Sequence, residues 1–229
     1  MRSCGKQFLS SYLSRVFSMT RIRQRVRIHF QKVGDLRWIS HRDLVRVFER
    51  IFRRAGLKLS MSEGFHPKAR MSFPSALALG IAGQDEVMDV ELAENEATEV
   101  IAQKLDALTP PGLIIDEVRK LDASEGKARV ERLVYQFPVP ESRRDEVADR
   151  IDEFLSRLPY SIKREGRKEP IDVGDSLEQL LLEDGFVRVV LRTTPTAAVR
   201  PREILMLLGL DDLEAAGHWI SRTAVELAP

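Results

Sequence analysis

The sequence predicts an α+β fold made of two tandem ferredoxin-like units, each with the element order βαββαβ and an antiparallel sheet. Strand-like and helix-like hydrophobic periodicities follow one another in that order over residues 20–122, and the same order returns over residues 129–229. The chain of 229 residues, 43% of them hydrophobic, is also long and apolar enough to bury a core in each unit. We therefore expect two domains, one over each range, joined by a short linker.

The first strand is expected over residues 23–31. Val26, Ile28 and Phe30 alternate with polar residues, so they share one face of an extended chain. This period of two predicts a strand with one buried face.

The first helix is expected over residues 40–55. Ser40 and Asp43 have the spacing of a capping box, and Gly56 stands where a glycine often ends a helix. An apolar stripe recurs at helical spacing, and it consists of Leu44, Val47, Phe48, Ile51, Phe52 and Ala55. These signals together make this the clearest helix of the sequence.

The other elements follow from the same two periodicities and from turn residues. The first unit continues with a short strand at 57–61, an extended region at 69–92 interrupted by Gly80 and Gly83, a helix at 94–108 and a strand at 113–118. The second unit has strands at 130–139, 160–163, 177–182, 186–191 and 218–227, with a hairpin turn at 183–185, and helices at 141–158 and 201–208. In the helix at 141–158 we expect inward positions for Val147, Ile151, Phe154, Leu155 and Leu158.

Residues 1–19 are basic and serine-rich, and we do not assign them to the fold. They lack the apolar core of a secretory signal, and Met19 stands just before the first strand. We expect either a disordered tail or a start codon assigned too early. Because no run of about 18 apolar residues occurs, and Cys4 is the only cysteine, we expect a cytoplasmic protein that does not contact a membrane.

No pattern in the sequence indicates a metal or a cofactor. The four histidines lack metal-ligand spacing, and neither of the two common glycine-rich loops that bind nucleotide phosphates is present. We therefore expect neither a metal ion nor a cofactor.

Charge is distributed unevenly along the chain. Residues 20–70 carry a net charge of +10, whereas residues 71–229 carry −12. Such asymmetry indicates a polyanion-binding surface at one end, although two halves that attract each other would also explain it.

Three groups of basic residues are candidates for binding phosphates. The predicted helix at 40–55 carries five arginines opposite its apolar stripe, interrupted only by Glu49, and arginine donates paired hydrogen bonds to phosphate. The loop at 62–70 combines cations with an aromatic residue that can stack on a base, and a basic loop at 163–168 lies in otherwise acidic surroundings. Each of the three has a simpler explanation as a solvated surface or an inert turn. The expected nucleic-acid-binding residues are Arg37, Arg42, Arg46, Arg50, Arg53, Phe65, His66, Lys68, Arg70, Lys163, Arg164, Arg167, Lys168, Arg200 and Arg202.

Two histidines are the remaining candidates for catalysis. His41 with Asp43, or His66 with Glu63, can form an acid–base pair if folding brings them together. A histidine at a helix start or in a loop is more often structural, so we expect a protein that is not itself catalytic.

Several of these segments resemble one family of bacterial proteins, the radical-SAM-linked family, a domain of unknown function. The resemblance spans roughly residues 20–229, and its motifs are Gly34-Asp35-Leu36-Arg37-Trp38-Ile39-Ser40-His41 with Asp43-Leu44, Arg53 to Leu57, Ser62 to Pro67, Met71 to Phe73, Val87 to Leu92 and, more loosely, Lys168 to Val173 and Arg200 to Leu205. Members of the family occur as separate chains or fused behind a cobalamin-binding-type radical SAM protein, often beside genes for ribonuclease E/G-type proteins. The resemblance therefore implies a partnership with a radical SAM protein in RNA processing or modification.

Together these observations suggest an RNA-binding or substrate-presenting accessory to a radical SAM enzyme, with RNA such as tRNA or rRNA as its partner. One alternative is an RNA-acting enzyme that uses His41 or His66 as acid or base. The other is a protein–protein adaptor whose basic face docks on an acidic partner.

Overall fold

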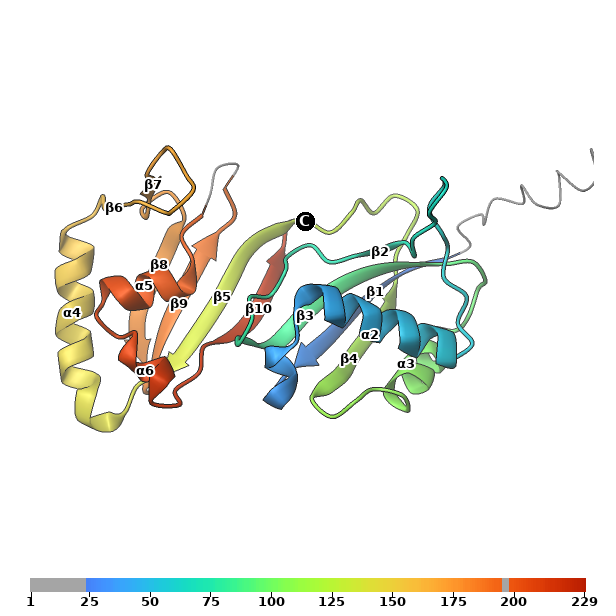
Figure 1. The fold of residues 1–229 in the computed structure, drawn as a ribbon, viewed down its shortest axis with the longest axis horizontal. Helices are drawn as coiled ribbons and strands as arrows, with labels where there is room; N and C mark the ends of the chain where they lie inside the picture. Colours follow the sequence, from blue (N-terminus) through green and yellow to red (C-terminus); the bar gives the residue numbers. More distant parts are fainter. Residues whose placement is uncertain (1–23, 195–197) are drawn as a thin grey trace, which may run out of the picture.

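The computed structural model describes residues 24–194 and 198–229, and it has a mixed α+β fold with a large, mostly antiparallel sheet (Figure 1). The α+β prediction is thus confirmed, while the expectation for residues 1–19 lies outside the described residues. The first half contains β1 (Gln24–Lys32), the 3-10 helix η1 (Gly34–Trp38), α2 (His41–Arg54), β2 (Met71–Ser72), β3 (Ala82–Leu92), α3 (Thr98–Asp106) and β4 (Leu113–Lys120). The second half contains β5 (Val130–Pro138), the 3-10 helix η2 (Glu141–Arg143), α4 (Arg144–Ser156), β6 (Ser161–Ile162), β7 (Ile171–Asp172), β8 (Leu177–Glu183), β9 (Phe186–Arg192), α5 (Pro201–Leu207), α6 (Asp212–Ala215) and β10 (Ser221–Leu227).

The two halves share one eight-stranded sheet instead of forming the two separate sheets that the sequence predicts. Its strand order is β4-β1-β3-β10-β5-β9-β8, and β2 pairs with the far end of β3. Strands β3 and β10 join the halves by a short parallel pairing, in which Ala82 lies opposite Ser221 and Gly83 opposite Arg222. Hydrophobic periodicity within a strand does not encode which edge strand will pair with it, so this junction could not be predicted.

Helices α2 and α5 lie on the same face of this sheet (Figure 1). Phe30 of β1 packs edge-on against Phe48 of α2, with ring centroids 5.0 Å apart, and it lies opposite Glu86 in the sheet. Glu86 pairs with Arg222, which lies opposite Tyr135 of β5. Tyr135 belongs to the core that also contains Ile204 and Leu205 of α5. Both helices therefore cover the same face of the sheet, one over each half.

Local signals in the sequence were reliable for α2 and for the hairpin β8–β9. The hydroxyl of Ser40 accepts a hydrogen bond from the backbone N–H of Asp43, and Gly56 follows the helix with a positive φ of 69°. Asp184 and Gly185, with φ of 51° and 80°, form the tight turn between β8 and β9. Within α2 the predicted stripe is the buried face, with Leu44, Phe48, Ile51 and Phe52 in the core.

The segment between α2 and β3 differs most from the prediction. In place of a strand at 57–61 there are two isolated bridges, Leu59 to Leu92 and Met61 to Ala69, and β2 has only two residues. The end of this segment crosses to the second half, because Leu77 and Ile81 are buried in the core that α4 and α5 cover. The first domain of the prediction thus contributes side chains to the second core.

Smaller differences occur in the helices and at the last strand. Helix α3 begins at Thr98 and β10 at Ser221, both later than predicted, and Leu155 of α4 is exposed although its spacing suggested an inward position. Helix α4 ends at Ser156, so Leu155 lies in its last turn. No helix in the described ranges is long and apolar enough to cross a bilayer.

Candidate functional site

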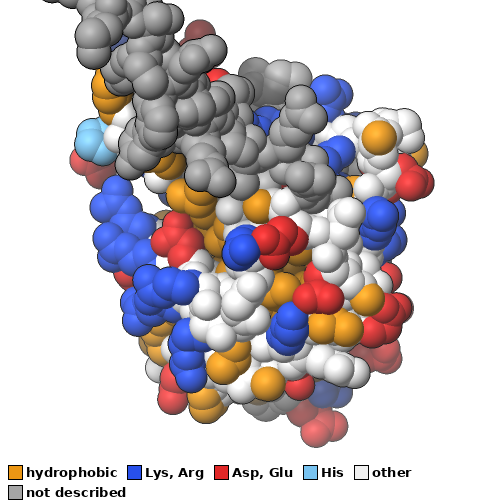
Figure 2. All heavy atoms as spheres, turned by 90° about the vertical axis from the view of Figure 1, so that its right-hand side faces the viewer, with side chains coloured by type: hydrophobic (Ala, Val, Ile, Leu, Met, Phe, Trp, Pro, Cys, Tyr) orange, Lys and Arg blue, Asp and Glu red, His pale blue; other side chains and the backbone are white. Residues whose placement is uncertain are grey.

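The exposed face of α2 carries a row of arginines without acidic partners. Arg42, Arg50, Arg53 and Arg54 are exposed, and none forms an ion pair or side-chain hydrogen bond within residues 24–194 and 198–229. Arg46 pairs with Asp43, with 3.1 Å between Nη1 and Oδ1. In Figure 2, which looks at the first half end on, Lys and Arg side chains gather along the edge where α2 lies. We call these five arginines the α2 face.

Asp43 is occupied by its neighbours at the start of α2. Its carboxylate accepts a hydrogen bond from the Ser40 hydroxyl at 2.7 Å and another from Arg46. The Ser40 hydrogen bond, together with Arg46 and Arg42, lowers the pKa of Asp43. This carboxylate therefore stays ionised and belongs to the helix cap.

Two depressions flank the α2 face. A cavity of about 430 Å³ lies between α2, where Arg50 and Arg54 border it, and the segment after α3, where Pro110 borders it. A second cavity of about 500 Å³ lies between Arg53 and the chain that leads to Met61. The arginines thus stand on a ridge between two hollows, where a bound chain can reach them from either side.

The loop at 62–70 lies between α2 and β2 along the chain. The hydroxyl of Ser62 accepts a hydrogen bond from the backbone N–H of Lys68 at 2.9 Å, which closes the loop. At its tip Phe65 is completely exposed, and His66 and Lys68 are exposed beside it. Arg70 has a different position, since it pairs with Glu91 at 3.3 Å and anchors the base of the loop.

The structure brings two separately predicted basic segments together in the second half. Arg164 donates to both carboxylate oxygens of Glu203, at 2.8 and 2.6 Å, and to the backbone carbonyl of Ala198 at 3.1 Å. This ion pair fastens the loop at 163–168 to the start of α5. We call the exposed cations that it gathers the second-half cluster, which consists of Lys163, Arg167, Lys168 and Arg200.

The Arg164–Glu203 pair is half-buried and holds both groups in their charged forms. Burial alone raises the pKa of Glu203, but the hydrogen bonds from Arg164 and from the backbone N–H of Arg200 outweigh it, so this pKa is lowered. The hydrogen bond to Glu203 raises the pKa of Arg164. Arg164 is thus a tether, and the neighbouring cations remain free for a ligand.

Arg37 and Arg202 lie at the junction of the two halves. The Arg37 guanidinium stacks on Trp38 and Trp219, 5.1 and 4.8 Å from their ring centroids, and these rings meet edge-on at 5.3 Å. Arg202 forms a bidentate ion pair with Glu214, at 2.7 and 3.0 Å. Both arginines are engaged in contacts within the protein, unlike four of the five arginines of the α2 face, since only Arg46 of those five has an ion pair within the described residues.

The structure does not bring either expected acid–base pair together. No hydrogen bond joins His41 to Asp43, or His66 to Glu63, in the described part of the chain. The His41 ring instead packs edge-on against Phe73, with centroids 5.1 Å apart, and burial together with the charge of Lys32 lowers the pKa of this histidine. Among the described residues there is also no cluster of three or more His, Cys, Asp or Glu that could hold a metal ion.

A buried charge cluster at the junction of the halves was missed by reasoning from the sequence. Arg222 is completely buried and forms a bidentate ion pair with the buried Glu86. Lys32, also buried, lies close enough to influence both and donates to the Ile39 carbonyl at 2.9 Å. In the sequence these residues look like the polar positions of exposed strand faces, so only the pairing of β3 with β10 reveals them.

The comparisons with known proteins identify one family. A family model described as an uncharacterized protein conserved in bacteria (DUF2344) matches residues 25–201, which is most of the chain. No curated protein matches the chain.

Proposed function

The chain belongs to the DUF2344 family of uncharacterised bacterial proteins, and we propose that it is an RNA-binding accessory that presents RNA to a radical SAM enzyme without catalysing the reaction itself. The observation that carries this proposal is the α2 face. Five exposed arginines on one helix, four of them without an acidic partner in the described chain, are an unusual excess of positive charge.

Polyanion binding is the function that such a surface supports best. Each guanidinium can donate two parallel hydrogen bonds to a phosphate, and release of counterions from the nucleic acid adds to the affinity. The exposed Phe65 at the tip of the loop between α2 and β2 offers a face on which an unpaired base can stack. The combination of phosphate donors with an exposed aromatic ring favours RNA that has single-stranded segments, such as the loops of tRNA or rRNA.

We also infer that each half is a ferredoxin-like unit. The strand orders β4-β1-β3-β2 and β10-β5-β9-β8, with antiparallel neighbours in each, support this inference. Such units often present one surface to RNA, although this is an analogy at the level of the fold.

The radical SAM partner follows from the sequence resemblance and from the cysteine content. A radical SAM cluster is bound by three closely spaced cysteines, and this chain contains only Cys4. The chemistry would therefore reside in a second protein, with the present chain supplying the RNA.

The α2 face can be tested by charge reversal. We expect the double variant Arg50→Glu/Arg53→Glu to bind RNA at least about 10-fold more weakly than the wild type, because two phosphate contacts become repulsive. The slope of log affinity against log salt should fall by about 1.4, since each contact to single-stranded RNA contributes about 0.7. Filter binding of cellular RNA at several salt concentrations measures both quantities.

The matched control is Lys120→Glu/Lys127→Glu, which changes the net charge by the same amount at two exposed lysines outside the α2 face. An equal loss of RNA affinity in the two double variants would show that net charge alone explains the effect, and it would refute the α2 face as the RNA-binding surface. Absence of RNA binding by the wild type even at low salt would reassign the surface to an acidic protein partner. Conversion of RNA by the purified chain, lost in His41→Ala or His66→Ala, would establish the enzyme alternative instead.

A further inference from the structure

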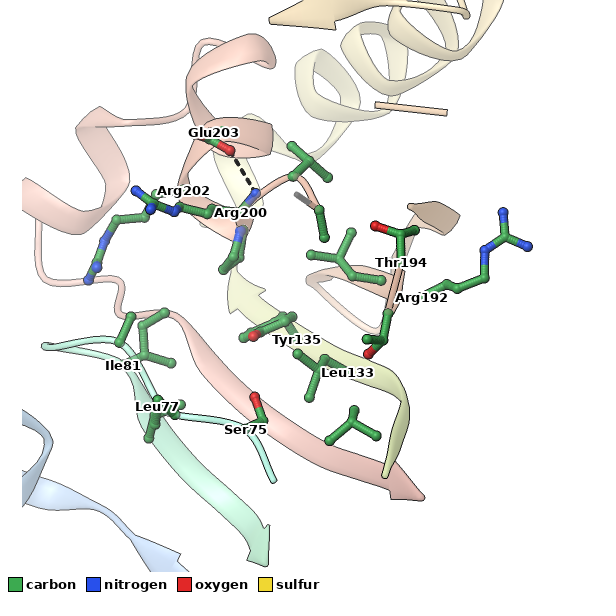
Figure 3. A pocket seen from close by; sticks show the side chains of 18 of the residues that line it. Ser75, Leu77, Ile81, Leu133, Tyr135, Arg192, Thr194, Arg200, Arg202 and Glu203 are labelled. Carbon is green, nitrogen blue, oxygen red and sulfur yellow. Dashed lines mark hydrogen bonds between the residues drawn. The ribbon is translucent and has the colours of Figure 1, made fainter. Parts of the chain in front are cut away.

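A cavity of about 830 Å³ lies between the two halves, on the face of the sheet that α2 and α5 also occupy (Figure 3). Leu77 and Ile81, from the segment before β3, form one wall, and the start of α5 with Arg200 and Glu203 forms the opposite one. Leu133 and Tyr135 of β5 lie between these walls. A cavity of this size, between two halves of a chain, is typical of sites for small molecules or single monomers of a polymer.

The interior of the cavity is mainly apolar, with a few hydroxyl groups. Leu77, Ile81 and Leu133 provide aliphatic surface, and the hydroxyls of Ser75 and Tyr135 also line the cavity. This composition suits a flat group that has a hydrophobic face and hydrogen-bonding atoms at its edge.

The buried charge cluster orients one of these hydroxyls. Arg222 Nη1 donates to the Ser75 hydroxyl at 2.9 Å, and Arg222 lies opposite Tyr135 in the sheet. Because the Ser75 oxygen already accepts from Arg222, its own O–H group is left to donate. The cavity therefore offers a donor to a ligand that carries acceptors, such as carbonyl oxygens and ring nitrogens.

Positive charge surrounds the mouth of the cavity. Arg200 lines it and has no ion pair within the described residues, and Arg192 extends outward from the rim (Figure 3). Arg164 binds Ala198 and Glu203, which both line the cavity, so it fastens the loop at 163–168 to the wall of the cavity that carries Arg200. An anionic group attached to the bound ligand would meet these cations.

The chain segment that lines the cavity also contacts the start of α2. Phe73 packs against His41, the first residue of α2, and the next residues along the chain, Pro74 and Ser75, line the cavity. An RNA strand that follows the arginines of α2 towards the N-terminal end of the helix would reach the cavity next.

We propose that this cavity accommodates one unstacked nucleotide of the bound RNA, with its base against Leu77, Ile81 and Leu133 and its phosphate towards Arg200 and the second-half cluster. The proposal rests on the proposed function for the presence of RNA, and it adds that one nucleotide is singled out from the strand. Taking a base out of its stack is how proteins gain access to its edges. Presentation of a single base is also what a modifying partner enzyme would require.

The first experiment follows the cavity directly by NMR. We expect the methyl signals of Leu77, Ile81 and Leu133 to shift on addition of a single-stranded RNA or of UMP, AMP, CMP or GMP, and not with inorganic phosphate alone. The shifts should be lost in Ala76→Trp, which places a large ring at the exposed edge of the cavity. In Arg200→Glu the apparent affinity for the nucleotide, read from the same shifts, should fall at least 5-fold. Because Arg200 is exposed, this substitution should leave folding intact.

The second experiment separates this proposal from the proposed function. With RNA that contains 2-aminopurine, whose fluorescence rises when the base unstacks, we expect an increase on binding that Ala76→Trp abolishes while most of the RNA affinity remains. RNA binding without methyl shifts at the cavity would overturn the nucleotide site and leave the α2 face standing. Methyl shifts with nucleoside monophosphates in a protein that binds no RNA would keep the nucleotide site and overturn the α2 face. Absence of shifts with RNA and with all four nucleotides would overturn the site outright.

Discussion

Single residues with unusual surroundings explain several features of this protein. Gly80 has a φ of 81°, and a Cβ at this position would lie 2.8 Å from Cζ3 of Trp38 and 3.1 Å from Nη2 of Arg202. Both the backbone conformation and the space therefore require glycine here. Because Trp38 also packs against Trp219 of the second half, the glycine allows the two halves to approach closely.

Glu125 makes a pH-dependent contribution to the stability of the folded state. Its carboxylate accepts two hydrogen bonds from Arg119, at 3.0 and 2.9 Å, and one from the backbone N–H of Asp122 at 2.9 Å. The Arg119 hydrogen bonds, followed by that of Asp122, lower the pKa of Glu125 to about 2 from a usual 4.5. A carboxylate with a lowered pKa stabilises the folded state above its unfolded pKa and loses this effect as the pH falls.

We therefore expect Glu125→Gln to lower the melting temperature at pH 6, and we expect the difference from the wild type to shrink between pH 4.5 and pH 2. Thermal unfolding followed by circular dichroism at several pH values measures this difference. Because the pair is solvent-accessible, the effect should be small and should decrease in high salt. A difference that is constant over this pH range would contradict the assigned cause.

At the scale of elements, α2 is the best-defined unit and the one on which the proposed function depends. Its cap, its apolar stripe and its terminal glycine all follow from the sequence, and its arginines occupy the opposite side because the stripe determines which side is buried. The two-residue strand β2 is the opposite case. Its sequence carries no periodicity of its own, and its pairing with β3 depends on the whole segment between α2 and β3.

We expect Ser40→Ala to destabilise the protein by about 1 kcal/mol, because the N–H of Asp43 loses its side-chain acceptor at the start of α2. Urea denaturation measures the change in the free energy of unfolding. Ser124→Ala, an exposed serine without a side-chain hydrogen bond in the described chain, is the control and should stay within about 0.5 kcal/mol of the wild type. Equal stability of the two variants would show that the cap contributes nothing.

At the scale of the whole molecule, the pairing of β3 with β10 turns two similar halves into one sheet. The ion pair between Glu86 and Arg222 lies under this junction and is almost completely inaccessible to water. A buried ion pair adds little net stability compared with apolar side chains, but a single unpaired buried charge is costly. Joining of the two halves therefore gives each of these buried charges its partner.

We expect Arg222→Met to destabilise the protein by about 3–5 kcal/mol, because Glu86 would be left buried without its partner. The double variant Arg222→Met/Glu86→Leu should recover part of this loss, since it removes the unpaired Glu86 carboxylate while Lys32 keeps its hydrogen bond to the Ile39 carbonyl. Chemical denaturation of both variants tests the coupling. Additive losses in the double variant would exclude an energetic interaction between the two groups.

Local patterns in the sequence are enough to predict the α+β class, the position of most helices and strands, the caps and turns, and the arginines of α2. These features depend on residues within a few positions of one another, so their physical causes are contained in short stretches of chain. Three features become visible only in the folded chain: one sheet spans both halves, Leu77 and Ile81 enter the second core, and Arg164 fastens the loop at 163–168 to the start of α5. The ion pair of Arg222 with Glu86 and the cavity between the two halves are likewise not visible in the sequence. Each of these contacts joins residues far apart in the chain, and their partners are selected by the packing of the whole molecule, which no local pattern of hydrophobicity or charge encodes.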